Sequence, residues 1–355
     1  MFRRAFTLPF RVFDIPVRLD ASFLFILPFF AYLIGSRVPD GMVPGSVAPY
    51  LLGLIAALGL FTSVLIHEIG HALTARFYGV ETKEITLWLL GGVAQLSDMP
   101  RHRGAEAVIA IAGPLTSGAL ALLFFGLSFL VTASAPASFV VNYLSVTNVA
   151  LAIFNLLPAL PLDGGRVLRS LLALKLEHLR ATRIAANISR VLAVLLGLFG
   201  LFGGQILLLL VAFFIFNAVG GETRYAAATN NLEGKTVQDL MNADVSTVEP
   251  DMPLESFRQL VYFKKQLGYP VVSGGKLVGF ASLHDAQDNT KNTVADIMHM
   301  PPTILESESA LNALKRLGQS DAGVAVVSAQ GDLLGLIERS DVLQVLNSKV
   351  EGQRS

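Results

Sequence analysis

The feature that most constrains this chain is a long apolar run that ends in two histidines and a glutamate. No residue from Val43 to Ile66 is charged, and the run continues directly into the sequence HEIGH at 67–71. An uncharged stretch of this length has the character of a membrane span. Ionisable side chains are costly inside a membrane, so we expect those in this run to serve a function.

The spacing of the two histidines indicates a metal site. On a helix, His67 and His71 lie at i and i+4 and project from one face, as two nitrogen ligands of one Zn²⁺ must. Glu68 lies one residue round the helix, where it can act as general base toward a water on the metal. The alternative is a chance match on a solvated charged face, but an apolar span offers no water to solvate Glu68.

Composition places the chain among membrane proteins that carry a soluble part. It has 355 residues, of which 53% are hydrophobic and 15% charged. Residues 1–230 hold 16 Lys and Arg against 11 Asp and Glu, whereas residues 231–355 hold 11 against 16. An acidic C-terminal part argues against nucleic acid as a partner. Cysteine is absent, so histidine and carboxylate must supply the ligands of any zinc ion.

Six apolar segments predict a multi-pass α-helical membrane domain in the lipid bilayer. Residues 1–20 form a basic leader, and the first apolar stretch lacks a cleavage site, so we expect it to be retained. The positive-inside rule places 1–20, the 76–104 loop and the C-terminal part in the cytoplasm, with the histidines toward the cytoplasmic leaflet. The expected spans are 21–36, 48–77, 105–131, 139–162, 191–203 and 205–219. The last two are short for full spans, so we expect them to form a helical hairpin that extends backward into 184–190.

Residues 84–97 have the period-two pattern of a β-hairpin. Ile85, Leu87 and Leu89 alternate with other residues up to the pair Gly91-Gly92. An ordinary interfacial loop is the alternative. Farther along, the basic residues that follow the fourth span are expected to be solvated or to contact headgroups, and they are Arg166, Arg169, Lys175, Arg180, Arg183 and Arg190.

The end of the fourth span predicts a broken helix and the third metal ligand. Two prolines and two glycines surround one acid, Asp163, which is flanked by apolar residues at membrane depth. Asn155 could donate a hydrogen bond to a substrate carbonyl or an oxyanion, whereas Asn148 is better explained by an interhelical hydrogen bond, as are Asn217 and Gln205. The remaining histidines are expected at the solvated surface, and they are His102, His178, His284 and His299.

The C-terminal part contains an internal repeat. Residues 236–241 match residues 293–298, and residues 279–285 match residues 335–341. Two copies predict a pseudo-twofold α/β module. The predicted organisation is a membrane domain at 1–220, a linker at 221–235 and a tandem module at 236–345, with repeats of about 236–290 and 293–345.

Together these motifs resemble the site-2 proteases, which are intramembrane zinc metalloproteases. The resemblance covers the whole membrane half and rests on HEIGH at 67–71, the glycine hairpin, Ala112-Gly113-Pro114, and the NxxP and LDG sequences at 155 and 162. It implies one zinc ion per chain, bound by His67, His71 and Asp163, with Glu68 as general base. It implies substrate contacts from Asn155 and from the hairpin residues Gly91, Gly92 and Val93. Members often carry Asn where this chain has Ser117, so no role is assigned to Ser117.

The repeat resembles a tandem pair of CBS domains. This resemblance implies an adenine nucleotide (ATP, ADP or AMP) as a regulator and a homodimer formed through the CBS pair. Ser282 and Asp285 match the hydroxyl and carboxylate that lie near a ribose, and Asp341 is the second carboxylate. The second repeat carries Glu338 where the hydroxyl belongs, so one competent site per chain is expected. A purely structural or dimerising CBS pair is the alternative.

The sequence thus predicts an intramembrane endopeptidase that cleaves transmembrane protein segments near the cytoplasmic leaflet, in regulated intramembrane proteolysis. A CBS-regulated channel or transporter would account for Asp163 and the CBS pair, but not for two histidines at i and i+4 around a glutamate. A catalytically inactive scaffold is the third reading, and the intact Glu68 argues against it.

Overall fold

A computed structural model describes most of the chain. The described residues are 5–88, 91–97, 104–264, 268–282, 284–287, 291–317, 324–328, 330–338 and 341. The chain divides into two compact units, Met1–Thr223 and Arg224–Ser355.

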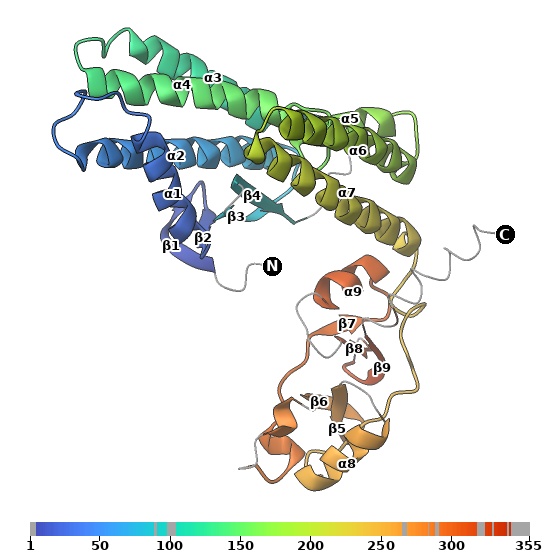
Figure 1. Cartoon of the computed structure of the whole chain (residues 1–355). Helices are drawn as coiled ribbons and strands as arrows, with labels where there is room; N and C mark the ends of the chain where they lie inside the picture. Colours follow the sequence, from blue (N-terminus) through green and yellow to red (C-terminus); the bar gives the residue numbers. More distant parts are fainter. Residues whose placement is uncertain are drawn as a thin grey trace. The chain divides into compact units, whose positions relative to one another are not determined.

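The helices confirm the multi-pass membrane fold (Figure 1). Among the described residues, five helices are long and apolar enough to cross a membrane, and a sixth apolar helix has 13 residues. At 1.5 Å per residue this sixth helix, α1, is shorter than the hydrocarbon core is thick. The helices are α1 (Phe23–Gly35), α2 (Ala48–Phe77), α3 (Ala105–Ser128), α4 (Ala135–Asn155), α6 (His178–Phe202) and α7 (Ile206–Leu232).

The last two helices are longer than the spans expected at 191–203 and 205–219. Helix α6 already begins at His178. Its first turns carry basic residues, which interrupt the apolar pattern from which the span was predicted. Helix α7 likewise continues through residues 220–232. The two helices share a core of small and branched side chains that includes Ala185, Ala193 and Ile215. Small residues allow such close helix contact in membranes.

The predicted hairpin is part of a larger sheet. Strands β3 (Thr82–Trp88) and β4 (Gly91–Leu96) pair antiparallel, and β4 begins at the glycine pair. Strand β2 (Ile15–Asp20) lies parallel to β3, and β1 (Ala5–Val12) pairs with β2, giving the order β1-β2-β3-β4. The sequence analysis read residues 1–20 only as a basic leader and missed these two strands.

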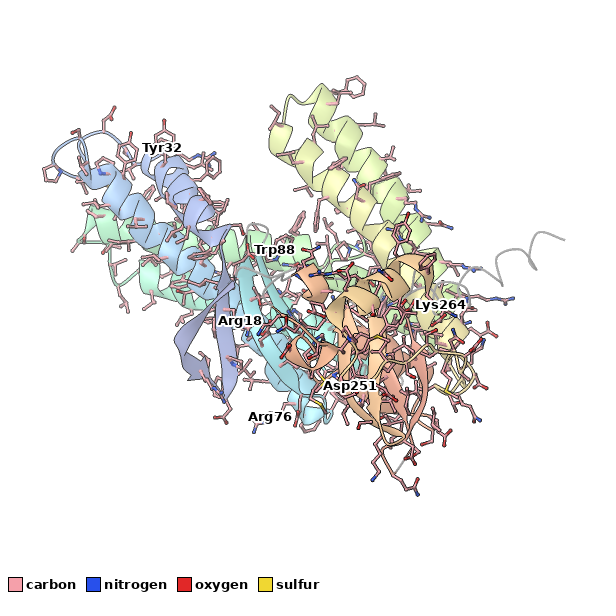
Figure 2. The ribbon with its side chains drawn as sticks, turned by 90° about the horizontal axis from the view of Figure 1, so that it is seen from below. Arg18, Tyr32, Arg76, Trp88, Asp251 and Lys264 are labelled. Carbon is pink, nitrogen blue, oxygen red and sulfur yellow. The ribbon has the colours of Figure 1, made fainter. Side chains whose placement is uncertain are left out.

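The sheet packs against the half of α2 that carries the histidines. Ile69 and Ala72 of α2 share a buried cluster with Ile15 of β2 and Ile85 of β3. An ion pair of 3.0 Å joins Arg18 of β2 to Glu84 of β3, and Figure 2 labels Arg18 beside the sheet. This packing brings the edge strand β4 against the histidine-bearing half of α2.

The fourth span ends in a broken helix, as expected. Helix α4 ends at Asn155, residues 156–162 are not helical, and α5 (Asp163–Ala173) begins with the acid itself. Helix α3 packs against α2, α4 and α5, and lies beside α4 in Figure 1. The break therefore returns Asp163 toward the helix α3 that also contacts α2.

The second unit confirms the tandem repeat. In the second repeat β7 (Thr303–Leu305) lies parallel to β8 (Val324–Val327), which pairs antiparallel with β9 (Leu333–Ile337). The first repeat has the hairpin of β5 (Gly268–Ser273) and β6 (Lys276–Ser282) with a single parallel bridge, from Val248 to Val271. The helices of the two repeats are α8 (Leu254–Lys264) and α9 (Ala310–Leu317).

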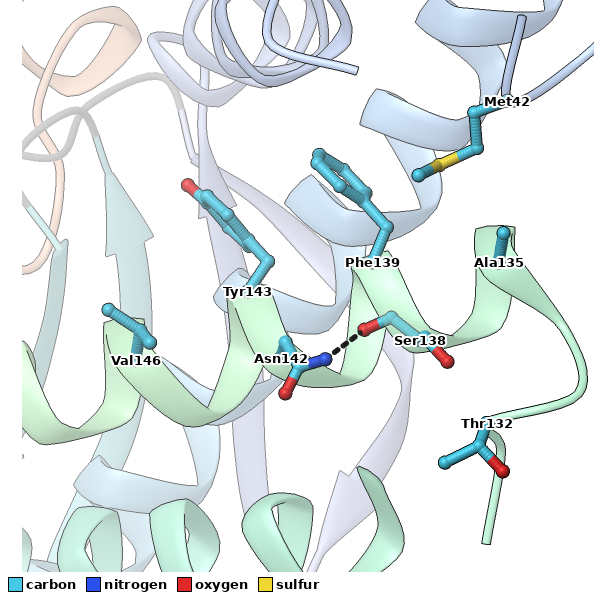
Figure 3. Close-up of a pocket in the computed structure, with 8 residues that line it drawn as sticks. All are labelled: Met42, Thr132, Ala135, Ser138, Phe139, Asn142, Tyr143 and Val146. Carbon is cyan, nitrogen blue, oxygen red and sulfur yellow. Dashed lines mark hydrogen bonds between the residues drawn. The ribbon is translucent and has the colours of Figure 1, made fainter. Parts of the chain in front are cut away.

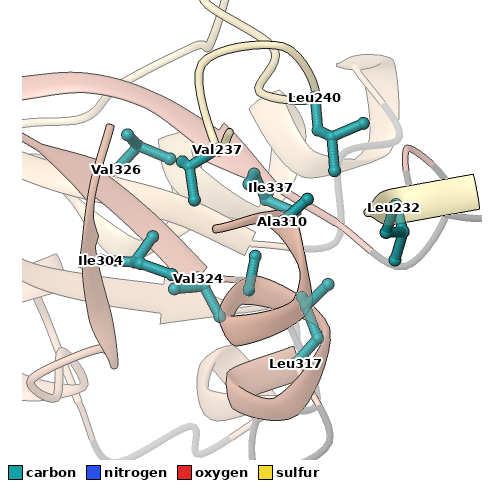
Figure 4. Close-up of a cluster of buried hydrophobic side chains, with 10 residues drawn as sticks. Leu232, Val237, Leu240, Ile304, Ala310, Leu317, Val324, Val326 and Ile337 are labelled. Carbon is teal, nitrogen blue, oxygen red and sulfur yellow. The ribbon is translucent and has the colours of Figure 1, made fainter. Parts of the chain in front are cut away.

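The repeats exchange backbone pairs with each other. Asn242 of the first repeat bonds reciprocally with Leu336 of β9, and His299 of the second repeat bonds reciprocally with Phe280 of β6. This exchange is the pseudo-twofold relation that the repeat predicts. Figure 4 shows an apolar core that joins the second repeat to the end of α7 and to the start of the first repeat. Its buried residues are Leu232, Val237, Leu240, Ile304, Ala310, Ala313, Leu317, Val324, Val326 and Ile337.

Candidate active site

Three side chains from two helices converge inside the first unit. The Nε2 atoms of His67 and His71 lie 3.2 Å apart, and each lies 3.2 Å from Oδ2 of Asp163. Zn–N and Zn–O bonds of about 2.0–2.1 Å in a tetrahedron place ligand atoms about 3.3 Å from one another. The observed triangle therefore fits a tetrahedral zinc ion with one coordination position left open.

The three side chains are almost enclosed by protein. His67, His71 and Asp163 are 4%, 9% and 8% exposed. They are the one cluster of this kind among the described residues. Asp163 occupies the first turn of α5, where free backbone N–H groups favour a carboxylate. The broken helix thus supplies both the depth and the orientation of the acid.

Each histidine is oriented through its other ring nitrogen. Nδ1 of His71 lies 2.7 Å from the carbonyl oxygen of Ile109, and Nδ1 of His67 lies 2.9 Å from the hydroxyl of Ser117. A proton on Nδ1 leaves the lone pair of Nε2 for a metal. Both partners come from α3. The sequence analysis assigned no role to Ser117, and the structure places it in contact with a candidate ligand.

The small residues of α3 let it approach the two rings. A Cβ atom on Gly113 would lie 2.2 Å from Nε2 of His71 and 2.6 Å from Nε2 of His67. No larger residue therefore fits at Gly113 without displacing the rings. The predicted close helix contact at Ala112-Gly113-Pro114 occurs at the histidines themselves.

Glu68 faces the sheet. Its Oε2 accepts a hydrogen bond of 3.0 Å from the backbone N–H of Ala94 in β4. A Cβ atom on Gly92 would lie 2.5 Å from Cγ of Glu68, so β4 can lie this close only because residue 92 is glycine. The side chain is half-buried. The hairpin residues Gly91 and Val93 belong to the same strand.

The two asparagines of α4 differ in their surroundings. Asn148 is fully buried and donates to Ser63 of α2 at 3.0 Å, which confirms the interhelical hydrogen bond. Asn155 is half-buried at the end of α4, and its amide donates to the carbonyl oxygen of Leu151, one turn back. The amide of Asn217 also bonds within its own helix, to Phe213, so the interhelical expectation is not met there.

One basic residue departs from the expected solvated cluster. Arg169 of α5 is 3% exposed and forms ion pairs with Glu106 of α3 and, at 3.0 Å, with Glu222 of α7. Two carboxylates from other helices remove this guanidinium from solvent, which the sequence pattern could not show. Arg166 and Arg180 are exposed, as expected.

The other predicted residues lie in the second unit or outside the described residues. His178, His284 and His299 are exposed, and His102 is not among the described residues. Asp285 accepts hydrogen bonds from the hydroxyl of Ser282 at 2.6 Å and from its N–H at 2.9 Å, and Nδ1 of His299 lies 3.6 Å away. Asp341 accepts at 2.7 Å from the N–H of Glu338.

A hollow of about 590 Å³ lies away from this site, at the opposite end of α4 (Figure 3). Phe139 and Tyr143 line it with stacked rings, and Asn142 donates to the carbonyl oxygen of Ser138. None of the candidate metal ligands lines this hollow. The candidate metal site is therefore separate from this hollow.

Comparison with known proteins identifies the two parts. Residues 55–135 and 130–199 match peptidase family M50, and residues 237–288 and 294–348 match the CBS domain. A zinc metalloprotease of Methanocaldococcus jannaschii is 33% identical over 338 residues, covering 95% of each chain.

Solved structures resemble each part. A site-2 protease from Methanocaldococcus jannaschii is 33% identical and covers 62% of this chain and 95% of its own, with a TM-score of 0.46. CBSX2 in complex with AMP is 26% identical and covers 32% of this chain and 98% of its own, with a TM-score of 0.31. Given the family matches and the full-length relative, this chain belongs to the site-2 proteases of peptidase family M50 and is a multi-pass membrane zinc metalloprotease with a C-terminal pair of CBS domains.

Proposed function

We propose that this protein cleaves membrane-spanning segments of other proteins, within the membrane and near the cytoplasmic leaflet. The observation that carries the proposal is the position of the triad. His67, His71 and Asp163 are buried among helices whose outer surfaces are apolar. In a bilayer, the segments that lie at the depth of this site are those that are themselves in the membrane.

The proposed roles of the side chains are supported by this geometry. His67, His71 and Asp163 hold the zinc ion, which when bound supplies Lewis acidity to water and to the scissile carbonyl. Glu68, on the same helix but turned toward β4, accepts the proton of the attacking water and returns it to the leaving amine. Asn155 turns its amide toward the substrate carbonyl when substrate binds.

Strand β4 is the docking edge for substrate. It is the last strand of the sheet among the described residues, and it lies against Glu68. A helical peptide bond has its N–H and C=O engaged, so the substrate must be extended where it is cut. Pairing along Gly91, Gly92 and Val93 would satisfy the backbone of the unwound segment in apolar surroundings.

Proteolysis is tested by reconstitution. A single-span reporter protein is incorporated into liposomes with the wild-type protein, with Glu68→Gln, or with the matched control Glu81→Gln, which changes an exposed carboxylate. We expect cleavage by the wild type and the control and none by Glu68→Gln. Failure of the zinc-loaded wild type to cut any reporter, together with ion or solute flux through the liposomes, would favour the transporter reading. Zinc binding without cleavage or flux would favour the scaffold.

The orientation is part of the proposal. The end of α2 nearest the histidines carries Arg76, and the sheet beside it carries Arg18, so the positive-inside rule places this end in the cytoplasm together with the N-terminus and the CBS pair. Because the chain has no cysteine, single cysteines report accessibility cleanly. In intact cells an impermeant thiol reagent should label Asp40→Cys and spare Arg76→Cys. The opposite pattern would reverse the orientation.

We also propose that the CBS pair binds an adenine nucleotide at Ser282 and Asp285 and forms a homodimer. Ser282 and Asp285 present a hydroxyl and a carboxylate together, as ribose recognition requires. On α8, Tyr262 and Phe263 are exposed by 81% and 78% and offer an apolar surface to a second copy. Light scattering of the full chain should give a dimer mass, and Tyr262→Glu with Phe263→Glu should shift it to the monomer. A monomeric wild type would overturn the dimer.

A further inference from the structure

The hydrogen bond between Glu68 and Ala94 joins the candidate base to the strand on which substrate is proposed to dock. In a strand, successive N–H groups point to opposite edges. Ala94 pairs with Ile85 of β3 in the register, yet its N–H donates to Glu68. This N–H therefore faces the free edge of β4.

A second contact places the side chain of Glu68 beside this edge, over the face of β4 from which a side chain at residue 92 would project. Cγ of Glu68 would be 2.5 Å from a Cβ atom on Gly92, two residues before Ala94. Residues two apart in a strand share the same orientation. The base thus meets β4 at two points, with its alkyl part at the face of Gly92 and with its carboxylate at the N–H of Ala94.

One N–H cannot serve two acceptors in full. A substrate strand that pairs with the free edge of β4 needs the N–H of Ala94 for one of its carbonyl groups. While Glu68 accepts this hydrogen bond, its carboxylate is held against β4. When the substrate backbone takes the N–H, the carboxylate loses this partner and is free to turn toward the attacking water.

We infer that the Ala94 N–H is a positioning group that holds Glu68 in the substrate-free enzyme and releases it when an extended substrate pairs with β4. The inference rests on the proposed docking edge and adds a coupling between docking and the base. It implies a protease that is selective for segments able to form a strand. A peptide that reaches the zinc ligands without pairing with β4 should be cut slowly, because it does not release Glu68.

The decisive comparison uses two substrates and three proline variants of the full-length, zinc-loaded enzyme. One substrate is a transmembrane reporter, and the other is a short fluorogenic peptide that spans only the scissile bond. Ala94→Pro removes the N–H that Glu68 uses. Leu96→Pro removes the next N–H on the same edge, and Val93→Pro removes one that faces β3.

Ala94→Pro should change the two activities in opposite directions. Hydrolysis of the short peptide should rise about tenfold, the factor set by loss of one hydrogen bond to a charged group, while cleavage of the reporter falls. Leu96→Pro should lower reporter cleavage without raising peptide hydrolysis. If Ala94→Pro lowers reporter cleavage and leaves peptide hydrolysis unchanged, the docking edge stands and the release of Glu68 is wrong. If neither Ala94→Pro nor Leu96→Pro affects the reporter, the docking edge itself is wrong.

A second measurement does not depend on activity or on a proline variant that folds. Amide hydrogen exchange at Ala94 should be about tenfold faster in Glu68→Ala than in the wild type, because the acceptor is lost. Glu68→Gln keeps a side-chain oxygen that can accept the same hydrogen bond, so its exchange should stay close to that of the wild type. Equal exchange at Ala94 in Glu68→Ala and the wild type would overturn the inference.

Discussion

The hydroxyl of Ser117 lies 2.9 Å from Nδ1 of His67, although the two residues are on different helices and 50 positions apart. Ser117 is fully buried, so no water competes for this contact. The hydroxyl accepts a hydrogen bond from the Nδ1–H of His67, and with the proton kept on Nδ1 the lone pair of Nε2 is free to bind zinc. A residue for which the sequence analysis claimed no role thus sets the tautomer and the ring orientation of a candidate ligand.

We therefore expect Ser117→Ala to lower zinc affinity by about 10- to 100-fold, the usual effect of removing a partner of a metal-bound histidine. Competition with a chromophoric chelator measures this change. The matched control is Ser145→Ala, which removes another buried hydroxyl, one that donates to the carbonyl oxygen of Ala121 and not to a ligand. Equal zinc affinity of the two variants would show that Ser117 does not orient His67.

Removal of the third ligand should act more strongly. In Asp163→Ala two histidines alone remain, and zinc should be lost from the purified protein. Glu68→Gln is the paired variant, because Glu68 faces β4 and not the ligand triangle. It should keep one zinc per chain while losing proteolysis. Metal analysis of both proteins after the same dialysis decides the assignment, and full zinc content in Asp163→Ala would move the third ligand elsewhere.

The ion pairs of Arg169 give a prediction about stability. Arg169→Ala leaves Glu106 and Glu222 without their buried partner, and loss of one partner from a buried pair costs about 3–5 kcal/mol. Thermal unfolding in detergent should show a large loss. Arg166→Ala removes an exposed guanidinium three residues earlier and should change stability by less than about 0.5 kcal/mol. Similar losses of stability in both variants would show that the ion pairs of Arg169 do not stabilise the fold.

The sequence predicted those features that depend on local pattern. The apolar segments give the helices, the spacing of His67 and His71 gives a shared face, and the prolines and glycines around Asp163 give the helix break. The repeat in the second half gives the tandem module. Each of these follows from neighbours in the chain and from the cost of polar groups in a membrane.

Other features depend on which segments meet in space, and the sequence does not encode these locally. Strand β2 is unremarkable by itself and pairs with β3 across more than 60 residues. Arg169 looks like any basic residue after a span until Glu106 and Glu222 meet it. The bond from Ala94 to Glu68 involves a backbone N–H, which has no sequence signature.

Two equivalent aspartates give a pH dependence to the CBS pair. The backbone N–H of Thr236 lowers the pKa of Asp239, and that of Thr293 lowers the pKa of Asp296. A carboxyl group whose pKa is lowered by folding stabilises the fold above its unfolded pKa, and this stabilisation is lost as the pH falls through the folded pKa.

The wild type and the double variant Asp239→Asn, Asp296→Asn should therefore differ in melting temperature at neutral pH. The difference should shrink as the pH falls below about 4, where the wild-type carboxylates begin to take up protons. Calorimetry of the full chain over this range measures it. Asp244→Asn, an exposed aspartate of the same unit, serves as the control. A difference that stays constant with pH would show that the two carboxylates do not contribute.

The two repeats should differ in nucleotide binding, because the matching positions 282 and 338 carry different side chains. In both repeats the aspartate accepts a hydrogen bond from the N–H three residues earlier, at 2.9 Å for Asp285 and at 2.7 Å for Asp341. Ser282 adds a hydroxyl in the first repeat, whereas Glu338 adds a negative charge in the second, which would repel phosphate. Calorimetric titration of the full chain with ATP, ADP and AMP should give one site, lost in Asp285→Ala and kept in Asp341→Ala. Binding lost in both variants would make the site shared between the repeats, and no binding of any nucleotide by the wild type would leave the CBS pair a structural or dimerising module.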